Sequence, residues 1–240
     1  IMNFDNTLKV TRFNYTSKGK VNDLFLNFNN KLSSTFLKNN LTKLSFKESD
    51  VDIRYASDNN NFINSSGKYR LNDLNYLNYD FKIDFKDENL DLNINCEFDE
   101  SLNLDIINYN KDTKLVANIS TVIQKKENEI FFKKIQYKEN NNLIFIENLK
   151  LIKNKIISLK KLVIKTYLNK DIKNDFTLNF GKNIIISGKK YDSSNLIKII
   201  NSKKNENFFI KISKSIDISL DEIETPLSKT LSNFKLLGEI

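Results

Sequence analysis

The chain has 240 residues, of which 40% are hydrophobic, and a net charge of +8, so it is long and apolar enough to bury a core. It contains no histidine and one cysteine, Cys96, which excludes the usual catalytic triads, histidine-based zinc sites and an intrachain disulfide. Its longest apolar runs are about four residues, as at 143–146, whereas a helix needs roughly 20 to cross a bilayer. Neither a transmembrane helix nor a signal peptide is therefore predicted.

Short strands are predicted in the first quarter of the chain, where apolar and polar residues alternate. Val51, Ile53 and Tyr55 alternate with charged residues, as the dry and wet faces of a strand require. Asn, Asp, Ser and Gly gather at 58–61 and 65–67, and these residue types are typical of turns. The pattern predicts strands at 7–11, 23–28, 41–46 and 51–55, followed by a hairpin at 62–71.

The most regular alternation lies in the middle of the chain, between residues 77 and 106. An apolar residue takes every second position, and a helical period of 3.6 residues would scatter these side chains around the axis. Two strands are predicted at 77–85 and 90–98, and a third at 102–106 would complete an antiparallel meander. Cys96 takes an inward position, where we expect a buried structural thiol. The apolar members of the first two strands are Leu77, Tyr79, Phe81, Ile83, Phe85, Leu90, Leu92, Ile94 and Phe98.

Alternation continues through the second half with a turn roughly every 8 to 14 residues, which predicts one continuous run of hairpins. Further strands are predicted at 114–124, 129–137, 142–146, 149–152 and 156–167. Phe176, Leu178 and Phe180 form another alternating set, and Ile184 and Ile186 follow beyond Gly181.

Two short helices are predicted near the C-terminal end. Asp192 is a suitable N-cap for residues 192–200, because its carboxylate can accept backbone N–H groups of the following turn. Leu196 belongs to a one-sided apolar stripe in this segment. A second helix at 226–234 would have Pro226 at its first position, although a loop between strands is the alternative.

The sequence contains no glycine-rich phosphate loop, nucleophile elbow or metal-ligand cluster. We therefore expect no enzyme, no cofactor and no metal. The carboxylates on the wet face of the central strands could suggest glycosidase chemistry, but their regular alternation favours solvated, outward-facing residues. They are Asp80, Asp84, Asp91 and Glu97.

A basic segment lies between Glu147 and Asp171, where seven lysines occur without an acid. Residues 121–240 hold 23 basic and 13 acidic side chains, whereas residues 1–120 hold 15 and 17, so the positive charge belongs to the second half. We expect a solvated face here rather than a surface for anionic lipid. Nucleic acid is not expected, because Tyr167 is the only ring among these lysines. The lysines are Lys150, Lys153, Lys155, Lys160, Lys161, Lys165 and Lys170.

A sheet with one dry face must cover that face, yet only two short helices are predicted to do so. Either the strands close into a sandwich or barrel, or the sheet curls into a trough whose lining takes apolar ligands. The two-residue period is compatible with both.

The segment 184–197 resembles the AsmA-like family, particularly its YhdP type. It has the order of a strand, Gly188, two residues, Tyr191-Asp192 and a short helix that includes Leu196. The alternating stretch at 210–220 and the Gly-containing stretch at 231–240 resemble the strands that follow in that family. Family members belong to the repeating β-groove group, together with TamB and the bridge-like lipid transfer proteins.

The resemblance implies an all-β fold, an elongated and curved antiparallel sheet forming a taco-like β-groove. Residues 1–240 would be a single segment of a longer protein, with the motif in 184–240, anchored in the inner membrane by a part outside this segment. It also implies a non-enzymatic lipid conduit in the periplasm, moving phospholipid between the inner and outer membranes, with neighbouring groove segments as partners. A structural or adhesive β-sandwich of the cell envelope is the alternative. The acyl chains would contact the nine central residues given above together with Phe176, Leu178 and Phe180.

Overall fold

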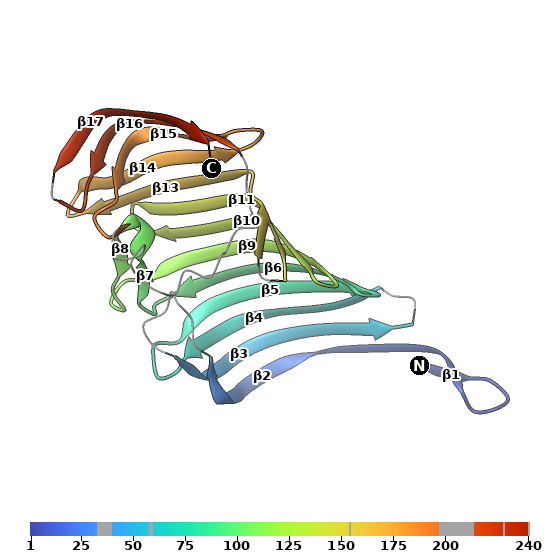
Figure 1. Ribbon diagram of the computed structural model, residues 1–240. Helices are drawn as coiled ribbons and strands as arrows, with labels where there is room; N and C mark the ends of the chain where they lie inside the picture. Colours follow the sequence, from blue (N-terminus) through green and yellow to red (C-terminus); the bar gives the residue numbers. More distant parts are fainter. Residues whose placement is uncertain (33–39, 58–59, 154, 197–213, 228, 240) are drawn as a thin grey trace.

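The computed structural model describes residues 1–240 except 33–39, 58–59, 154, 197–213, 228 and 240 (Figure 1). Its regular structure is almost entirely β, which confirms the predicted fold class. The strands of the main sheet are β1 (Met2–Phe4), β2 (Val10–Leu32), β3 (Leu41–Ala56), β4 (Asn61–Leu71), β5 (Leu77–Lys86), β6 (Asn89–Phe98), β9 (Ala117–Lys126), β10 (Glu129–Glu139), β11 (Asn142–Ile152), β12 (Lys155–Ser158), β13 (Lys161–Leu168), β14 (Asp171–Phe180), β15 (Ile184–Asp192), β16 (Ser215–Glu224) and β17 (Thr230–Glu239).

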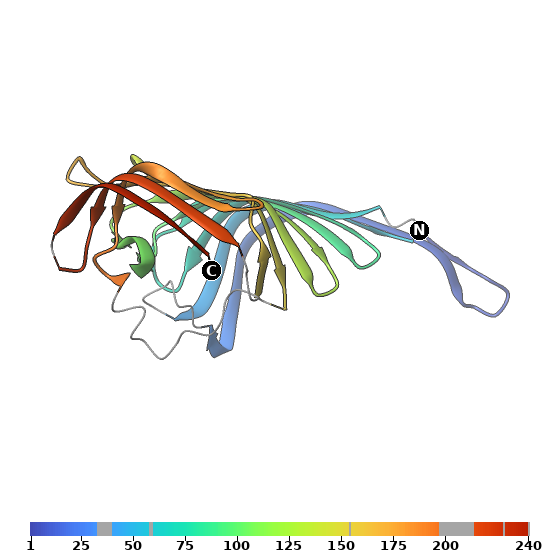
Figure 2. The same ribbon diagram turned by 45° about the horizontal axis from the view of Figure 1, so that its top comes forward.

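These strands follow one another across the sheet almost in chain order, with β12 beside β11 and β13 also hydrogen-bonded to β11. Neighbours are antiparallel, as predicted, except for β15 and β16, which run parallel. The chain leaves β15 at Asp192 and begins β16 at Ser215, a connection long enough to return it to the same end of the sheet. The sheet stays open and arches strongly, as Figure 2 shows.

Several strands are longer than the alternation predicted, because local irregularities interrupt the pattern without ending the strand. Glu48 in β3 and Asn148 in β11 take left-handed backbone angles, with φ of 50° and 53°. Each such residue adds one position and restores the facing of the side chains beyond it. The predicted strands at 41–46 and 51–55 are therefore one strand, and those at 142–146 and 149–152 are another.

The hairpin predicted at 62–71 is wrong, because these residues lie in the single strand β4. Ser65, Ser66 and Gly67 were expected to form its turn. At Gly67 the backbone of β4 instead lies very close to the backbone of β3. A Cβ atom on Gly67 would be 2.6 Å from the Cα of Ser49. Glycine serves here for close approach of two backbones and not for a turn.

The third strand predicted for the central meander also differs. Residues 99–116, called the insertion from here on, leave the main sheet after β6, and β6 pairs with β9 instead. The insertion contains β7 (Leu102–Leu104), a 3₁₀ turn η1 (Asp105–Ile107) and β8 (Tyr109–Lys111), with β7 and β8 paired to each other. Asn108 ends the 3₁₀ turn in a left-handed conformation that asparagine tolerates.

Of the two predicted helices, the second is absent and the first is described only at its start. Residues 226–234 are a turn at Pro226 and Leu227 followed by β17, so the alternative of a loop between strands is the observed one. At the first site, β15 continues to Asp192, a turn follows, and Leu196 is helical, while 197–200 lie outside the described residues. No helix in the described part of the chain is long and apolar enough to cross a membrane.

The buried core lies at one end of the strands, between the main sheet and the insertion. Ile107 of η1 is 2% exposed and Ala117, where β9 begins, is fully buried. The other members of this cluster are Phe98, Tyr109, Tyr137, Ile164, Phe176 and Leu220. In Figure 2 the insertion lies on the concave side of the arch, so the face on which it packs is the concave face.

Candidate functional site

The feature that sets this molecule apart is a continuous apolar face on the concave side of the sheet. Directly paired residues on neighbouring strands share a face, so the register can be followed from strand to strand. Phe81 of β5 pairs with Ile94 of β6, and the same row continues to both sides. From β2 to β17 it consists of Gly19, Val51, Ser65, Phe81, Ile94, Thr121, Ile135, Ile146, Leu162, Leu178, Ile186, Ile218 and Leu236.

A second row runs parallel to the first, nearer to the insertion, and contains Tyr79 and Phe176. It consists of Gly67, Tyr79, Cys96, Ile119, Tyr137, Ile144, Ile164, Phe176, Gly188, Leu220 and Phe234. The two predicted lining sets, from residues 77–98 and 176–180, therefore lie on one face although nearly 80 residues separate them in the chain. These rows, with the alternate residues beside them, are called the apolar face below.

The predicted lining residues differ in burial along the length of the strands. Phe98 and Phe176 are buried in the cluster that the insertion covers, and Tyr79 is buried against the rings of Phe46, Tyr69 and Phe81. Toward the opposite end the side chains are half-buried, packed against strand neighbours but not covered from above by described residues. This half-buried group comprises Phe81, Ile83, Phe85, Leu90, Leu92, Ile94, Leu178 and Phe180. Leu77 is half-buried as well, although it begins β5 at the insertion's end.

The residues of the resemblance motif anchor the insertion to the sheet. The hydroxyl of Tyr191 donates to the carbonyl of Ile106 at 2.9 Å, and Asn108 donates to the carboxylate of Asp192 at 3.0 Å. Asp192, which is 1% exposed, also accepts the backbone N–H of Ser194, which is the capping contact predicted for it. Leu196 is half-buried beyond this turn. The contacts of Tyr191 and Asp192 hold the insertion on the sheet.

Glycine is required at position 188 because the neighbouring strand leaves no room for a side chain. A Cβ atom at this position would lie 2.3 Å from the carbonyl oxygen of Asp175 and 2.5 Å from the Cα of Phe176. Both are backbone atoms of the paired strand β14, which cannot move aside as a flexible side chain could. Any side chain here would therefore separate β14 from β15.

Asn174 is the central hydrogen-bonding residue under the insertion and is completely buried. Its amide donates to the carbonyl of Ile107 and to the hydroxyl of Thr166, both at 2.8 Å. Its oxygen accepts the backbone N–H of Asp192 at 2.9 Å. One side chain thus joins the insertion, β13 and β15, and all its partners are polar groups that would otherwise be unpaired in the core.

A chain of hydrogen bonds connects the insertion to β10. Tyr109 donates to Glu139 at 2.9 Å, so the proton in its 2.8 Å contact with Tyr137 comes from the Tyr137 hydroxyl. Burial is the main cause that raises the pKa of both tyrosines, in the case of Tyr137 to about 12, and the nearby Glu139 charge adds to it. The two phenols therefore stay protonated and hydrogen-bonded at neutral pH.

Lys111 is the least expected residue of the insertion, because a charged side chain that is 1% exposed is rare. Its ammonium group donates to the carbonyl oxygens of Glu100 and Asp112 and lies 5.3 Å from the ring centre of Phe98. Burial lowers the pKa of Lys111, and the surrounding carboxylates oppose that shift. The ammonium group of Lys111 therefore joins backbone carbonyls within the insertion and is buried from solvent.

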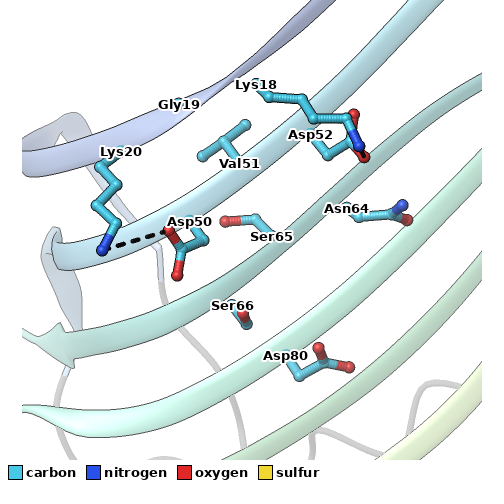
Figure 3. Close-up of a pocket in the computed structure, with 10 residues that line it drawn as sticks. All are labelled: Lys18, Gly19, Lys20, Asp50, Val51, Asp52, Asn64, Ser65, Ser66 and Asp80. Atoms are coloured by element: carbon cyan, nitrogen blue, oxygen red, sulfur yellow. Dashed lines mark ion pairs between the residues drawn. The ribbon is translucent and has the colours of Figure 1, made fainter.

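The convex face carries charged and polar side chains that satisfy one another. A shallow hollow of about 520 Å³ lies over β2 to β5, and Figure 3 shows the residues that line it. Lys18 pairs with Asp52 at 2.9 Å and Lys20 with Asp50 at 3.9 Å, so both lysines of its lining are paired with carboxylates. The wet-face carboxylates predicted to be solvated behave similarly. Asp84 pairs with Lys82, Asp91 accepts from Gln124, and Glu97 accepts from Asn78, while Asp80 is exposed.

The basic segment is divided by the sheet into two kinds of lysine. Lys150, Lys160 and Lys165 form ion pairs with Glu129, Glu147 and Asp175 of neighbouring strands or turns. Lys153 lies instead in the turn between β11 and β12, Lys155 begins β12, and both are exposed. Lys161 begins β13, and Lys170 lies in the exposed turn that precedes β14.

Sequence reasoning missed two parts of this region. Ile144, Phe145 and Ile146 are consecutive apolar residues, so alternation alone did not show that Ile144 and Ile146 face the concave side while Phe145 faces the other. The docking of the insertion was also missed, because its contacts join residues far apart in sequence. The break in alternation after Phe98 and the Asn-rich turn at 108–110 were the signals that could have indicated it.

Cys96 lies on the apolar face between Tyr79 and Ile119 and is half-buried. Burial raises the pKa of its thiol, which keeps it protonated, in agreement with a structural role. In the part of the chain that the structure describes, no group of three or more Cys, Asp or Glu side chains is placed to hold a metal ion.

Comparison with known proteins gave no relative from which a function could be carried over. No family model, no curated protein and no solved structure matches this chain.

Proposed function

We propose that the chain is a non-enzymatic lipid-binding segment whose concave apolar face holds the acyl chains of phospholipids. The observation that carries this proposal is the continuity of that face. One row of side chains crosses the sheet from β2 to β17, and its members between Phe81 and Leu178 are predominantly apolar and half-buried. A core of the usual kind would be covered by a second layer, and described residues supply such a layer only at the end where the insertion packs.

The chemistry of the face suits acyl chains better than small polar ligands. Aliphatic and aromatic side chains dominate it, and Thr121 is the main polar member of its central rows apart from Ser65. Removing one CH₂ group from water contributes roughly 0.8 kcal/mol, so a chain of many CH₂ groups gains enough to bind without polar recognition. Selectivity for the headgroup is accordingly expected to be weak on this face.

The apolar rows cross all the strands of the sheet, and such a path favours movement of lipid along the protein over storage of lipid at one place. The rows run perpendicular to the strands and offer similar contacts at each step, so a chain that slides by one strand spacing exchanges one set of apolar contacts for another. We therefore infer a conduit, acting in the cell envelope between the inner and outer membranes and anchored through a part of the parent protein outside this segment. The resemblance of 184–197 to the AsmA-like family supports this placement.

The alternative of a structural or adhesive β-sandwich requires two sheets that close on each other. The described strands form one long sheet and the small β7–β8 pair. The insertion covers only one end of the apolar face, which favours the lipid-binding proposal over the sandwich.

Site-specific photo-crosslinking tests the proposal. A photoreactive amino acid is placed at Phe81 or Ile94, on the apolar face, and in matched controls at Asp80 or Asn93, which occupy the opposite face of the same strands. Each protein is irradiated with radiolabelled phospholipid. Capture of lipid at Phe81 and Ile94, with little at the controls, is expected; equal capture on both faces, or none on either, would contradict acyl-chain binding here.

A further inference from the structure

The end of the strands opposite the insertion has a concentration of exposed lysines that ion pairs do not neutralise. This end contains the turns after β5, β9, β11 and β14, and Figure 2 shows the first three projecting side by side from one edge of the sheet. Six exposed or half-exposed lysines of this end that have no ion pair among the described residues are Lys125, Lys126, Lys153, Lys155, Lys182 and Lys214. We call this set the basic rim.

Backbone contacts show that the turns of the basic rim belong to one edge. The N–H of Lys153 donates to the carbonyl of Asn128 in the neighbouring β9–β10 turn. The ammonium of Lys214 donates to the carbonyl of Gly181, which precedes Lys182, and lies over the ring of Phe180. The sheet therefore gathers lysines that are as many as 89 positions apart in the sequence, between Lys125 and Lys214.

This edge also carries acids: Asp87, Glu88 and Glu127 are exposed in the turns after β5 and β9, and two further acids lie on the strands beside them. Glu129 pairs with Lys150 at 2.9 Å, and Asp91 accepts a hydrogen bond from Gln124 at 2.6 Å. A hollow of about 420 Å³ lies here, with Lys86, Lys125 and Lys126 in its lining together with these two acids and Phe131. Three lysines face two acids in this hollow, and the turns after β11 and β14 contain no acid, so the edge as a whole carries more lysines than acids.

The opposite end of the same strands is acidic, so the molecule has a charge polarity along the strand direction. The insertion has four acids, Asp99, Glu100, Asp105 and Asp112, against two lysines. The ion pairs of Lys173 and Lys190 with Glu224 lie at this end as well. Exposed lysines without an ion pair also occur at this end, among them Lys138 and Lys170, but they adjoin Glu139 and Asp171, whereas the turns after β11 and β14 contain lysines and no acid.

The position of Lys125 on the apolar face indicates which kind of partner the basic rim binds. It takes a position on the apolar face, paired with Leu90 of β6 and Ile130 of β10, although its neighbours in that row are apolar. A lysine within an apolar row near the strand ends can keep its ammonium at a polar boundary while its stem and its neighbours contact hydrocarbon. The boundary between phosphate headgroups and acyl chains has this arrangement of charge and apolar surface.

We propose that the basic rim docks this protein on the surface of a bilayer rich in anionic phospholipid, with the half-buried end of the apolar face directed toward the hydrocarbon. This goes beyond the proposed function, since it names the edge that meets a membrane and the charge of the lipid. Nucleic acid fits less well, because the rim lysines adjoin Leu90 and Ile130 and an apolar face rather than a groove lined with stacking rings.

Vesicle co-sedimentation tests this docking surface. The rim variant carries Lys125→Gln, Lys126→Gln, Lys153→Gln and Lys155→Gln. The matched control variant loses the same number of exposed lysines from the other end or from the turns next to the insertion, and therefore has the same net charge. It carries Lys114→Gln, Lys138→Gln, Lys170→Gln and Lys189→Gln.

Wild-type protein is expected to sediment with phosphatidylglycerol vesicles at low salt, to be released by about 0.5 M salt, and to ignore phosphatidylcholine vesicles. Each lysine near an anionic surface contributes a severalfold effect, so the rim variant should bind at least about tenfold more weakly and the control variant nearly as well as wild type. Equal losses in both variants would mean that net charge alone acts, and would overturn the proposal. So would no binding to phosphatidylglycerol, or tighter binding to a short DNA duplex that the rim variant loses.

Failure of this proposal can be told apart from failure of the proposed function. The rim variant should still bind a fluorescent fatty acid, because the apolar face is intact. An Ile94→Asp variant should lose the fatty acid and still sediment with phosphatidylglycerol vesicles. Loss of both activities in both variants would indicate misfolding, which a circular dichroism spectrum and a thermal melt of each variant check directly.

Discussion

At the scale of single residues, the sheet depends on a few positions where two backbones lie so close that no side chain fits between them. Gly188 and Gly67 both allow close approach of neighbouring strands, and each would place a Cβ atom within 2.6 Å of a backbone atom. Gly19 in β2 differs, because its Cβ atom would meet nothing within 4 Å. A side chain is therefore excluded at Gly188 and Gly67 but has room at Gly19.

Gly188→Ala is predicted to destabilise the protein by about 1–3 kcal/mol, the usual cost of forcing extra atoms into a packed site. Gly19→Ala is the control and should be neutral or slightly stabilising, because alanine lowers the entropy of the unfolded chain and has room here. Urea denaturation followed by circular dichroism measures both. Equal stability of the two variants would show that β14 and β15 can separate at no cost.

The buried tyrosines give the stability a dependence on alkaline pH. The pKa of Tyr137 is raised by burial from 10.0 to about 12, so the unfolded state releases this proton at lower pH than the folded state. Between these values the unfolded state binds fewer protons, and the free energy of unfolding must fall as pH rises. The contribution is complete below about pH 10 and is lost by about pH 12.

Replacing Tyr137 with Phe removes this titration and is predicted to flatten the decline in stability above about pH 10. Urea denaturation of wild type and Tyr137→Phe across this range measures the difference. Lys111, whose pKa is lowered by burial, titrates in both proteins and cancels in the comparison. A parallel decline in the two proteins would show that Tyr137 ionises in the folded state as readily as in the unfolded state.

At the scale of elements, the insertion is the part that converts an open sheet into a structure with one closed end. Its two consecutive isoleucines have opposite surroundings: Ile107 is 2% exposed and packs on the sheet, whereas Ile106 is 60% exposed. The 3₁₀ turn at Asp105–Ile107 sets this difference. Asn174 and Asp192 then hold the turn by hydrogen bonds to Ile107 and Asn108.

Ile107→Ala is predicted to cost about 2–4 kcal/mol, since it leaves a cavity between the insertion and the sheet. Ile106→Ala removes the same atoms from an exposed position of the same turn and should change the stability by less than about 0.5 kcal/mol. Urea denaturation gives both free energies, and limited proteolysis shows whether cleavage in 99–116 accelerates for Ile107→Ala alone. Equal effects of the two substitutions would mean that the insertion does not pack as described.

At the scale of the whole molecule, the apolar face is half-buried over much of its area, and this distinguishes it from a closed core. An ion placed in a dry core without a partner is strongly destabilising, whereas an ion on an open face keeps water on one side. Ile94 is half-buried near the middle of the face, and Ile164 is 4% exposed under the insertion. The two residues therefore allow the same substitution in both environments.

Ile94→Asp is predicted to keep a near-native thermal melt and to lose binding of a fluorescent fatty acid. Ile164→Asp should unfold or aggregate, because its carboxylate would be buried among Ile144 and Phe176. A thermal melt and a fatty-acid titration of each variant provide the two readouts. Collapse of Ile94→Asp would indicate a packed core at that site, and a native melt with unchanged binding would exclude Ile94 from the ligand surface.

The amino-acid sequence by itself determined the all-β fold, most of the antiparallel strand order and the dry faces of the central strands. These features follow from the two-residue period, which is a local property: Leu90, Leu92 and Ile94 must share a face of any strand that contains them. The Asp192 capping contact was legible for the same reason, since its partner Ser194 is two residues away.

Only the tertiary structure decided how these strands combine. The row from Gly19 to Leu236 depends on the register of every strand pair. The short strand at 102–104 pairs with β8 in the insertion, which packs on the sheet and does not continue the meander. Asn108 and Asp192 are 84 residues apart, and the lysines of the basic rim come from separate turns. Contacts of this kind have no local pattern, because their free energy comes from the burial and charge that exist only once the sheet has formed.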